Sequence, residues 1–241
     1  MSHVTEAISR IKALAKQPLS EEREKRRVEI IMLKFKEDPE IIDKAVTRII
    51  HNTDWPFKLN IFDNRPLEGE ENNANTSRIW NKLINESTCP YVLIMDSDAY
   101  IPSIKTNPCW LTRMMESINE TGVVIPVSSK GGGAHQHVNG PVPYPSTAIN
   151  KDAWSGYCFL ISKEAYKKNG IFNEMYYRYG QDSEWAIRCG INLGGAVMRK
   201  DVFVEHIGGA SFDSDSGKDE DKLYARELFL YHIRKYAKGN I

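Results

Sequence analysis

Two aspartates, Asp96 and Asp98, follow an apolar run and are separated by a single residue. The run at 91–95 has the composition of a buried strand. In open α/β sheets, ligands bind outside the carboxyl ends of the strands, and oxygen ligands of this type suit Mg²⁺ or Mn²⁺ that carries a phosphate. The spacing therefore predicts a metal and diphosphate site, with a polar turn after a buried strand as the alternative.

Two later residues have side chains that could complete such a site. Asp182 begins a predicted helix at 182–189 and could take a proton from a hydroxyl group, although an aspartate there could also cap the helix. His206 follows a predicted strand at 202–205 and precedes two glycines, so its ring could turn into a cleft. Imidazole suits Mn²⁺ better than Mg²⁺. The alternative for a single histidine is packing or surface exposure.

The elements that would position these side chains alternate between strand and helix. Strands are predicted at 28–35, 57–62 and 91–95, and helices between them at 41–51 and 76–85. This alternation predicts parallel strands joined by helical crossovers. Asp63 follows the second strand as Asp96 follows the third, so we expect both carboxylates at one edge of the sheet.

The second half continues the pattern less regularly. Strands are predicted at 122–127, 156–161 and 202–205, and helices at 110–118, 163–168, 182–189 and 223–236. A glycine- and proline-rich loop at 131–145 and an acidic segment at 213–221 interrupt them. We expect a helical appendage at 1–27, one α/β domain at 28–212, and a loop and C-terminal helix at 213–241 that pack on the same domain.

Composition narrows the class of protein. The 241 residues include 32 basic and 32 acidic residues, so no global positive field favours nucleic acid. The four cysteines form no Cys-x-x-Cys pair, which argues against a zinc knuckle. The start shows no signal pattern, and no apolar run is long enough to span a bilayer. We therefore expect a cytoplasmic protein without a transmembrane segment.

Three segments together resemble the family-two glycosyltransferases: the strand, helix and strand at 28–64, the Asp96-Ser97-Asp98 triplet, and the stretch at 170–188. The resemblance implies a GT-A fold, an α/β architecture with a mostly parallel central sheet flanked by helices. In that fold a Rossmann-like nucleotide-binding half is joined to an acceptor-side half. The segment at 28–212 would be the GT-A domain.

The resemblance also implies roles for the residues that match the family's motifs. Asp63 would contact the nucleotide base, and Asp96 would contact the ribose or a metal-bound water. Asp98 would bind the divalent cation, Mn²⁺ or Mg²⁺, and His206 would be a further metal ligand, with Asp96 the third member of the metal set. Asp182 would be the catalytic base. Further candidate donor-binding residues are Asn81, Trp154 and Gly156.

Two positions depart from the family pattern, Asn173 and Gln181, where acids are usual. Glu184 and Arg188, four residues apart on the helix after Asp182, are expected to form a surface ion pair. The implied activity is metal-dependent, inverting transfer of a sugar from a nucleoside diphosphate, UDP- or GDP-linked, to an acceptor hydroxyl. The acceptor could belong to a glycan, a lipid-linked sugar, a protein or a modified nucleic acid.

Two other functions stay open at this point. A nucleotidyltransferase would share the metal carboxylates but needs a glycine-rich triphosphate loop, and residues 34–39 contain no glycine. A non-catalytic sugar- or nucleotide-binding module of the same fold is favoured by Gln181 and disfavoured by the aspartates and histidine of the predicted site.

Overall fold

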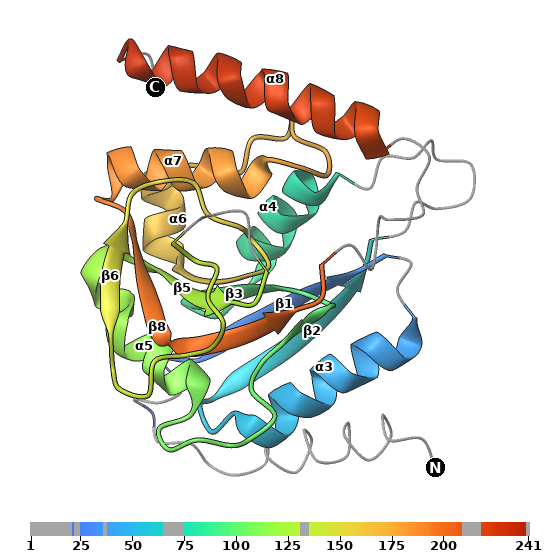
Figure 1. Ribbon diagram of the computed structural model, residues 1–241, viewed down its shortest axis with the longest axis vertical. Coiled ribbons are helices and arrows are strands. Elements are labelled where there is room, and N and C mark those ends of the chain that lie inside the picture. Colours follow the sequence, from blue (N-terminus) through green and yellow to red (C-terminus); the bar gives the residue numbers. More distant parts are fainter. Residues whose placement is uncertain are drawn as a thin grey trace.

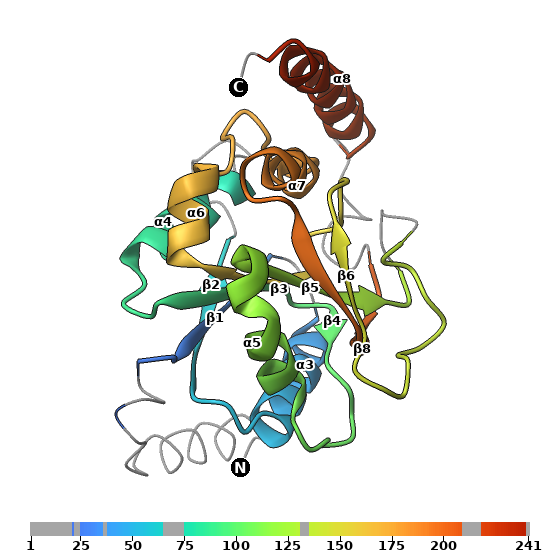
Figure 2. The same ribbon diagram turned by 90° about the vertical axis from the view of Figure 1, so that its left-hand side faces the viewer.

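The strands in the described part of the chain form one eight-stranded sheet between layers of helices (Figures 1 and 2). The computed structural model describes residues 21, 25–35, 38–64, 75–130, 135–208 and 218–239. The sheet order is β2-β1-β3-β7-β5-β8-β4, and β6 pairs with β8. The expected α/β fold, with helices on both sides of a central sheet, is confirmed.

The first half has the predicted strand and helix alternation. Strands β1 (Val28–Lys34), β2 (Phe57–Asp63) and β3 (Tyr91–Asp96) pair in parallel. The crossover helices are α3 (Pro39–Asn52) and α4 (Thr76–Glu86). Each crossover helix begins at a side-chain cap, since Asp38 accepts the N–H of Glu40 and Asn75 accepts that of Arg78. These local signals explain why both helices begin close to where the sequence predicts them.

The second half inserts an antiparallel strand into the sheet. After β4 (Ala99–Tyr100) and α5 (Trp110–Thr121), the strands are β5 (Val123–Ser128), β6 (Thr147–Asn150), β7 (Cys158–Ser162) and β8 (Ala196–His206). Strand β7 runs antiparallel to both β3 and β5, whereas β5 and β8 are parallel. The other helices among the described residues are α6 (Lys163–Asn169), α7 (Gln181–Asn192) and α8 (Lys218–Ala237). The sequence missed β4 and β6, and β8 begins at Ala196 instead of 202.

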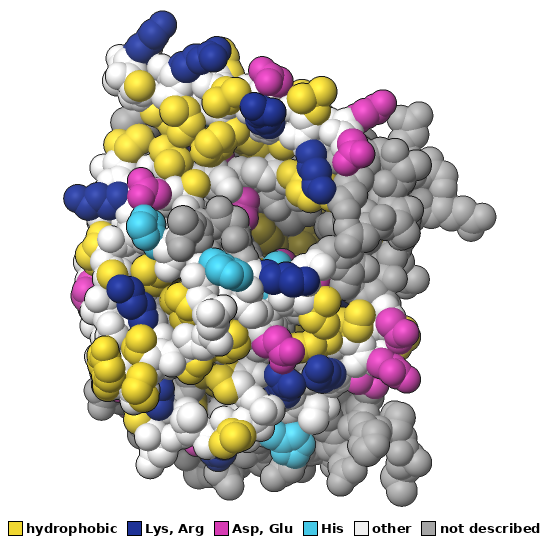
Figure 3. Space-filling view, in the orientation of Figure 1, with side chains coloured by type: hydrophobic (Ala, Val, Ile, Leu, Met, Phe, Trp, Pro, Cys, Tyr) yellow, Lys and Arg dark blue, Asp and Glu magenta, His cyan; other side chains and the backbone are white. Residues whose placement is uncertain are grey.

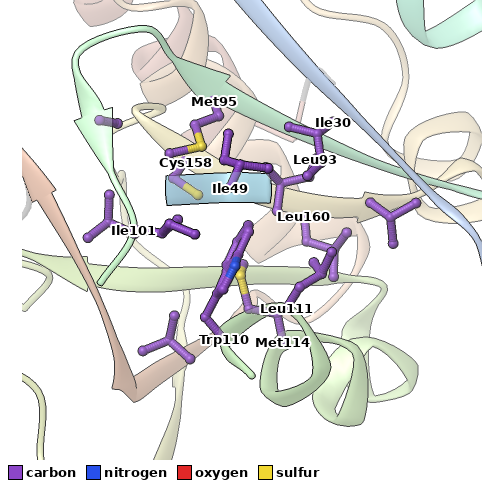
Figure 4. Packing of buried hydrophobic residues seen from close by; sticks show 14 of the residues in the cluster. Ile30, Ile49, Leu93, Met95, Ile101, Trp110, Leu111, Met114, Cys158 and Leu160 are labelled. Carbon is purple, nitrogen blue, oxygen red and sulfur yellow. The ribbon is translucent and has the colours of Figure 1, made fainter. Parts of the chain in front are cut away.

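Alternate residues of the central strands fill two cores, one on each face of the sheet. On one face, Leu93 and Met95 pack with Ile49 of α3 and Trp110 of α5, all nearly inaccessible to solvent (Figure 4). On the other face, the core residues come from the strands and from α4, α6 and α7, and include Trp80, Phe159, Phe172 and Trp185. This two-sided burial requires the continuous apolar runs seen in β3, β5 and β7.

Helix α8 lies outside these layers, next to α7 (Figures 1 and 2). No helix in the described part of the chain is both long and apolar enough to cross a membrane. The predicted helix at 4–16, the glycines at 131–133 and most of the acidic segment, 213–217, lie outside the described residues. The division into an appendage, a main domain and a C-terminal helix stays a prediction.

Candidate functional site

Asp96, Asp98 and His206 meet at the carboxyl edge of the sheet. One ligand atom from each lies within 4.8 Å of the others. The His206 Nε2 atom is 3.3 Å from Asp98 Oδ1 and 3.8 Å from Asp96 Oδ2. Two carboxylates and one imidazole are a donor set that suits Mn²⁺, and also Mg²⁺ through the oxygens. These residues therefore fit a divalent cation by their chemistry.

Backbone pairing sets the positions of Asp98 and His206, the two most buried members of this triad. Asp96 is the last residue of β3, and the chain turns at Ser97 and Asp98 into β4. Strand β4 pairs antiparallel with the end of β8, where Ala99 lies opposite His206. The N–H of Ile207 donates to the carbonyl of Asp98 at 3.1 Å. Residues more than a hundred positions apart are thus held by one short ladder.

The surroundings orient the His206 ring toward the carboxylates. Its Nδ1 lies 3.4 Å from the carbonyl of Lys130, so a ring protonated at Nδ1 leaves Nε2 free to bind a metal. Burial alone would lower the pKa of His206, but the hydrogen bond to Asp98 and the charges of Asp96 and Asp98 raise the pKa above its ordinary value. Asp98 is almost buried and Asp96 is open, with 6% and 43% of their side chains exposed.

The dipeptide Gly156-Tyr157 joins this triad to Asp182. The Tyr157 ring stacks on His206 with 5.0 Å between centroids, and the carbonyl of Tyr157 accepts the N–H of Asp96 at 2.8 Å. The N–H of Gly156 donates to Asp182 Oδ2 at 2.6 Å. The sequence suggested Gly156 for its small size, but no pattern indicated that Tyr157 would support the histidine.

Asp182 is the second residue of α7, and the N-cap position belongs to Gly180, whose φ of 82° favours glycine. Its Oδ1 accepts the N–H of Ser183 at 2.7 Å, so each carboxylate oxygen has one backbone donor. Burial raises the pKa of Asp182, and the backbone donors of Gly156 and Ser183 offset only part of that rise. A raised pKa makes this carboxylate a better base than a helix N-terminus alone would allow.

Asp63 lies along the same edge of the sheet as Asp96. It ends β2, and Lys34 beside it in β1 forms an ion pair with it at 3.2 Å. On the other side of β1, Leu33 lies opposite Asp96 of β3. The sequence placed both aspartates at one edge, and the parallel pairing of β2, β1 and β3 puts them there.

Two predicted donor-binding residues are engaged elsewhere. The amide of Asn81 is fully used inside the protein: Oδ1 accepts from Phe172 N and Tyr166 Oη, and Nδ2 donates to Phe172 O and Glu174 Oε1. It ties α4 to the segment at 172–174 and has no hydrogen-bonding capacity left for a nucleotide. The Trp154 ring is 1% exposed and packs against Phe159 and Trp185.

Two buried polar atoms, one of them in the residue next to Asp182, have no hydrogen-bond partner within the described structure. They are the indole nitrogen of Trp154 and the side-chain oxygen of Gln181. Gln181 lies one turn before Trp185 on α7. The rings of Trp185 and Trp154 pack edge to face, with 6.3 Å between their centroids. Gln181 is thus a buried, neutral neighbour of the candidate base, 7% exposed.

The expected surface ion pair of Glu184 and Arg188 is wrong, because both residues are buried. Arg188 binds Glu184 through two nitrogens at 2.7 and 2.8 Å, and it also donates to the carbonyls of Asn169 and Ile171. The hydroxyl of Tyr236 in α8 also donates to Glu184. The pair is buried because the 169–171 segment and α8 cover it.

Comparison with solved structures identifies the fold. TarS 1–349 from S. aureus aligns with a TM-score of 0.58 at 14% identity, covering 86% of this chain and 65% of that one. Its complex with UDP aligns with a TM-score of 0.53 at 14% identity, over 74% of this chain and 60% of that one. GalNAc-T7 with UDP, GalNAc and Mn²⁺ aligns with a TM-score of 0.55 at 11% identity, over 75% of this chain and 43% of that one.

These neighbours are GT-A glycosyltransferases, and the chain has their GT-A fold. The chain spans less than two thirds of the length of each of them. No protein-family model and no curated protein matches the sequence.

Proposed function

We propose that the protein is a metal-dependent, inverting glycosyltransferase of the family-two type that uses a UDP-linked sugar. The link through Gly156-Tyr157 is the observation that supports this most directly, because it fixes a candidate base relative to a candidate metal triad. The neighbours solved with UDP support the choice of nucleotide.

In this proposal Asp98, His206 and Asp96 hold the cation. When bound, such a cation neutralises charge on a departing diphosphate. Asp63, at the same sheet edge, contacts the nucleotide base. The open carboxylate of Asp96 faces the ribose side, and the buried carboxylate of Asp98 is the principal metal ligand.

Asp182 takes the proton of the acceptor hydroxyl. Its raised pKa suits a general base, and the two backbone donors fix the carboxylate in one orientation. A single displacement, with the acceptor oxygen attacking the anomeric carbon as the diphosphate leaves, inverts the configuration at that carbon. The proton of the hydroxyl ends on Asp182 and the electron pair of the broken bond on the diphosphate.

The first test is stabilisation by Mn²⁺ and UDP. Together they should raise the thermal midpoint of the wild-type protein, since a ligand at about 100 times its Kd stabilises by about 2.7 kcal/mol. Asp98→Ala should abolish the shift. Asp54→Ala is a matched control, because Asp54 is exposed and precedes the amino end of β2, whereas the candidate site lies at the carboxyl ends of the strands. Equal shifts in wild type and Asp98→Ala would remove the metal site from the proposal.

The second test separates binding from catalysis. In Asp182→Asn, Mn²⁺ and UDP should still raise the thermal midpoint, but the variant should no longer release UDP from a UDP-sugar. Full UDP release by Asp182→Asn would exclude Asp182 as the base. A wild-type protein that binds UDP with Mn²⁺ and turns over none of a panel of UDP-sugars would favour the non-catalytic module.

A further inference from the structure

The outward side of α8 carries a regular stripe of exposed side chains that no described part of the chain covers. Their spacing of three and four residues places them on one face of the helix. We call them the α8 stripe: Glu220, Leu223, Glu227, Tyr231 and Arg234 of α8, and Lys238 in the turn that follows the helix. Leu223 and Tyr231 are 59% and 62% exposed.

The opposite side of α8 is already occupied. His232 accepts or donates a hydrogen bond with the Tyr176 hydroxyl at 3.0 Å, and Tyr236 binds Glu184. Arg178 forms an ion pair with Asp221, and Ala225 lies against Gly180. Because these contacts fix which face of α8 points inward, the α8 stripe must point outward.

Charge is divided along the α8 stripe. Glu220 and Glu227 lie in its first part, and Arg234 and Lys238 lie in its last part. In Figure 3, basic side chains lie at the left-hand end of α8, acidic and further basic side chains lie toward its right-hand end, and apolar side chains lie along the helix. Within the described residues these four charged side chains form no ion pair or hydrogen bond with the protein.

We propose that the α8 stripe binds the same stripe of a second copy of this chain, in an antiparallel, two-fold arrangement. A two-fold axis makes one surface complementary to itself, so each acidic end meets a basic end. When Glu220 lies beside the partner's Lys238, Leu223 lies beside the partner's Arg234, and Glu227 beside the partner's Tyr231. A parallel arrangement would instead set like charges against each other.

The two tyrosine side chains carry the apolar part of this contact. Tyrosine and arginine are the residues that most often dominate the energy of an interface, and the aliphatic part of Arg234 can pack on Leu223. A single pair of helices is a small interface. We therefore expect a dimer in the micromolar range, more stable at low than at high salt.

Sedimentation equilibrium of the full chain tests this proposal directly. The wild-type protein should change from monomer to dimer between about 1 and about 300 µM. Tyr231→Ser should weaken dimerisation at least about tenfold. Tyr144→Ser is the matched control, because Tyr144 is equally exposed at 63% and lies in the loop before β6.

Charge reversal tests the antiparallel register. Glu220→Lys and Lys238→Glu alone should each weaken dimerisation, and the double variant should restore it. A monomer at every concentration would overturn the proposal, and so would a dimer unaffected by Tyr231→Ser and by both charge reversals. A monomer whose α8 stripe binds phospholipid vesicles, and loses that binding in Tyr231→Ser, would assign the surface to a membrane instead. UDP and Mn²⁺ binding should be unchanged in all these variants.

Discussion

Replacing Gly156 by alanine should both destabilise the protein and displace the candidate base. A β-carbon at position 156 would lie 2.7 Å from the β-carbon of Asp182 and 3.2 Å from its Oδ2. The nearer atom belongs to the first turn of α7, so it cannot rotate away as the end of a flexible side chain could. The main chain at 156 or the start of α7 must move, which lengthens the 2.6 Å hydrogen bond from the Gly156 N–H.

The size of the effect follows from these two changes. Overpacking of this kind costs about 1–3 kcal/mol, and a lost hydrogen bond to a charged group about 1.5–3 kcal/mol. Because one displacement causes both, we expect a combined loss of about 2–4 kcal/mol in the free energy of unfolding. Misplacing a catalytic group by about 1 Å costs on the order of 100-fold in rate, so kcat should fall more than the KM for the donor rises.

Urea unfolding and UDP release from a UDP-sugar measure the two effects. Gly140→Ala is the control, because a β-carbon there meets nothing within 4 Å. If Gly156→Ala matched Gly140→Ala in both the urea midpoint and kcat, then the contact between Gly156 and Asp182 would have no energetic or catalytic weight.

Three further outcomes are expected. Because a base must be deprotonated and the pKa of Asp182 is raised, kcat should fall as the pH decreases, with its midpoint above the ordinary aspartate value of 3.8; a midpoint at or below that value contradicts the role. Arg188→Met strands the buried charge of Glu184 and should cost about 3–5 kcal/mol in urea unfolding, largely recovered by adding Glu184→Gln. Asn81→Leu should cost about 1–3 kcal/mol for each buried partner left unpaired, yet leave UDP affinity unchanged, and a loss of affinity in a folded variant would restore Asn81 as a nucleotide contact.

The architecture of the first half is predictable because its signals are local. Asp38 followed by Pro39, and Asn75 followed by Thr76, mark the starts of two helices in adjacent residues. Apolar runs between such signals leave parallel pairing as the simplest arrangement. The antiparallel β7 has no comparable local signal, because its direction depends on pairing with β3 and β5 on both sides.

The environment of a polar residue that contacts a distant segment is harder to predict for the same reason. Asn81 and its partner Phe172 are 91 positions apart, and Glu184 and Tyr236 are 52 apart. A sequence pattern shows that Glu184 and Arg188 face the same side of a helix. It does not show that a later helix covers that side, which turns an expected surface pair into a buried one.

The short ladder between β4 and β8 makes the candidate metal site dependent on a late part of the chain. Asp96 and Asp98 are synthesised about a hundred residues before His206, and only the docking of β8 brings the histidine to them. A cation bound by Asp96, Asp98 and His206 would therefore favour conformations in which β8 is docked. This effect would grow with the ratio of the free cation concentration to its Kd. In a cell, the supply of that ion would then affect how often the last strand is released, and so how long the folded protein survives proteolysis.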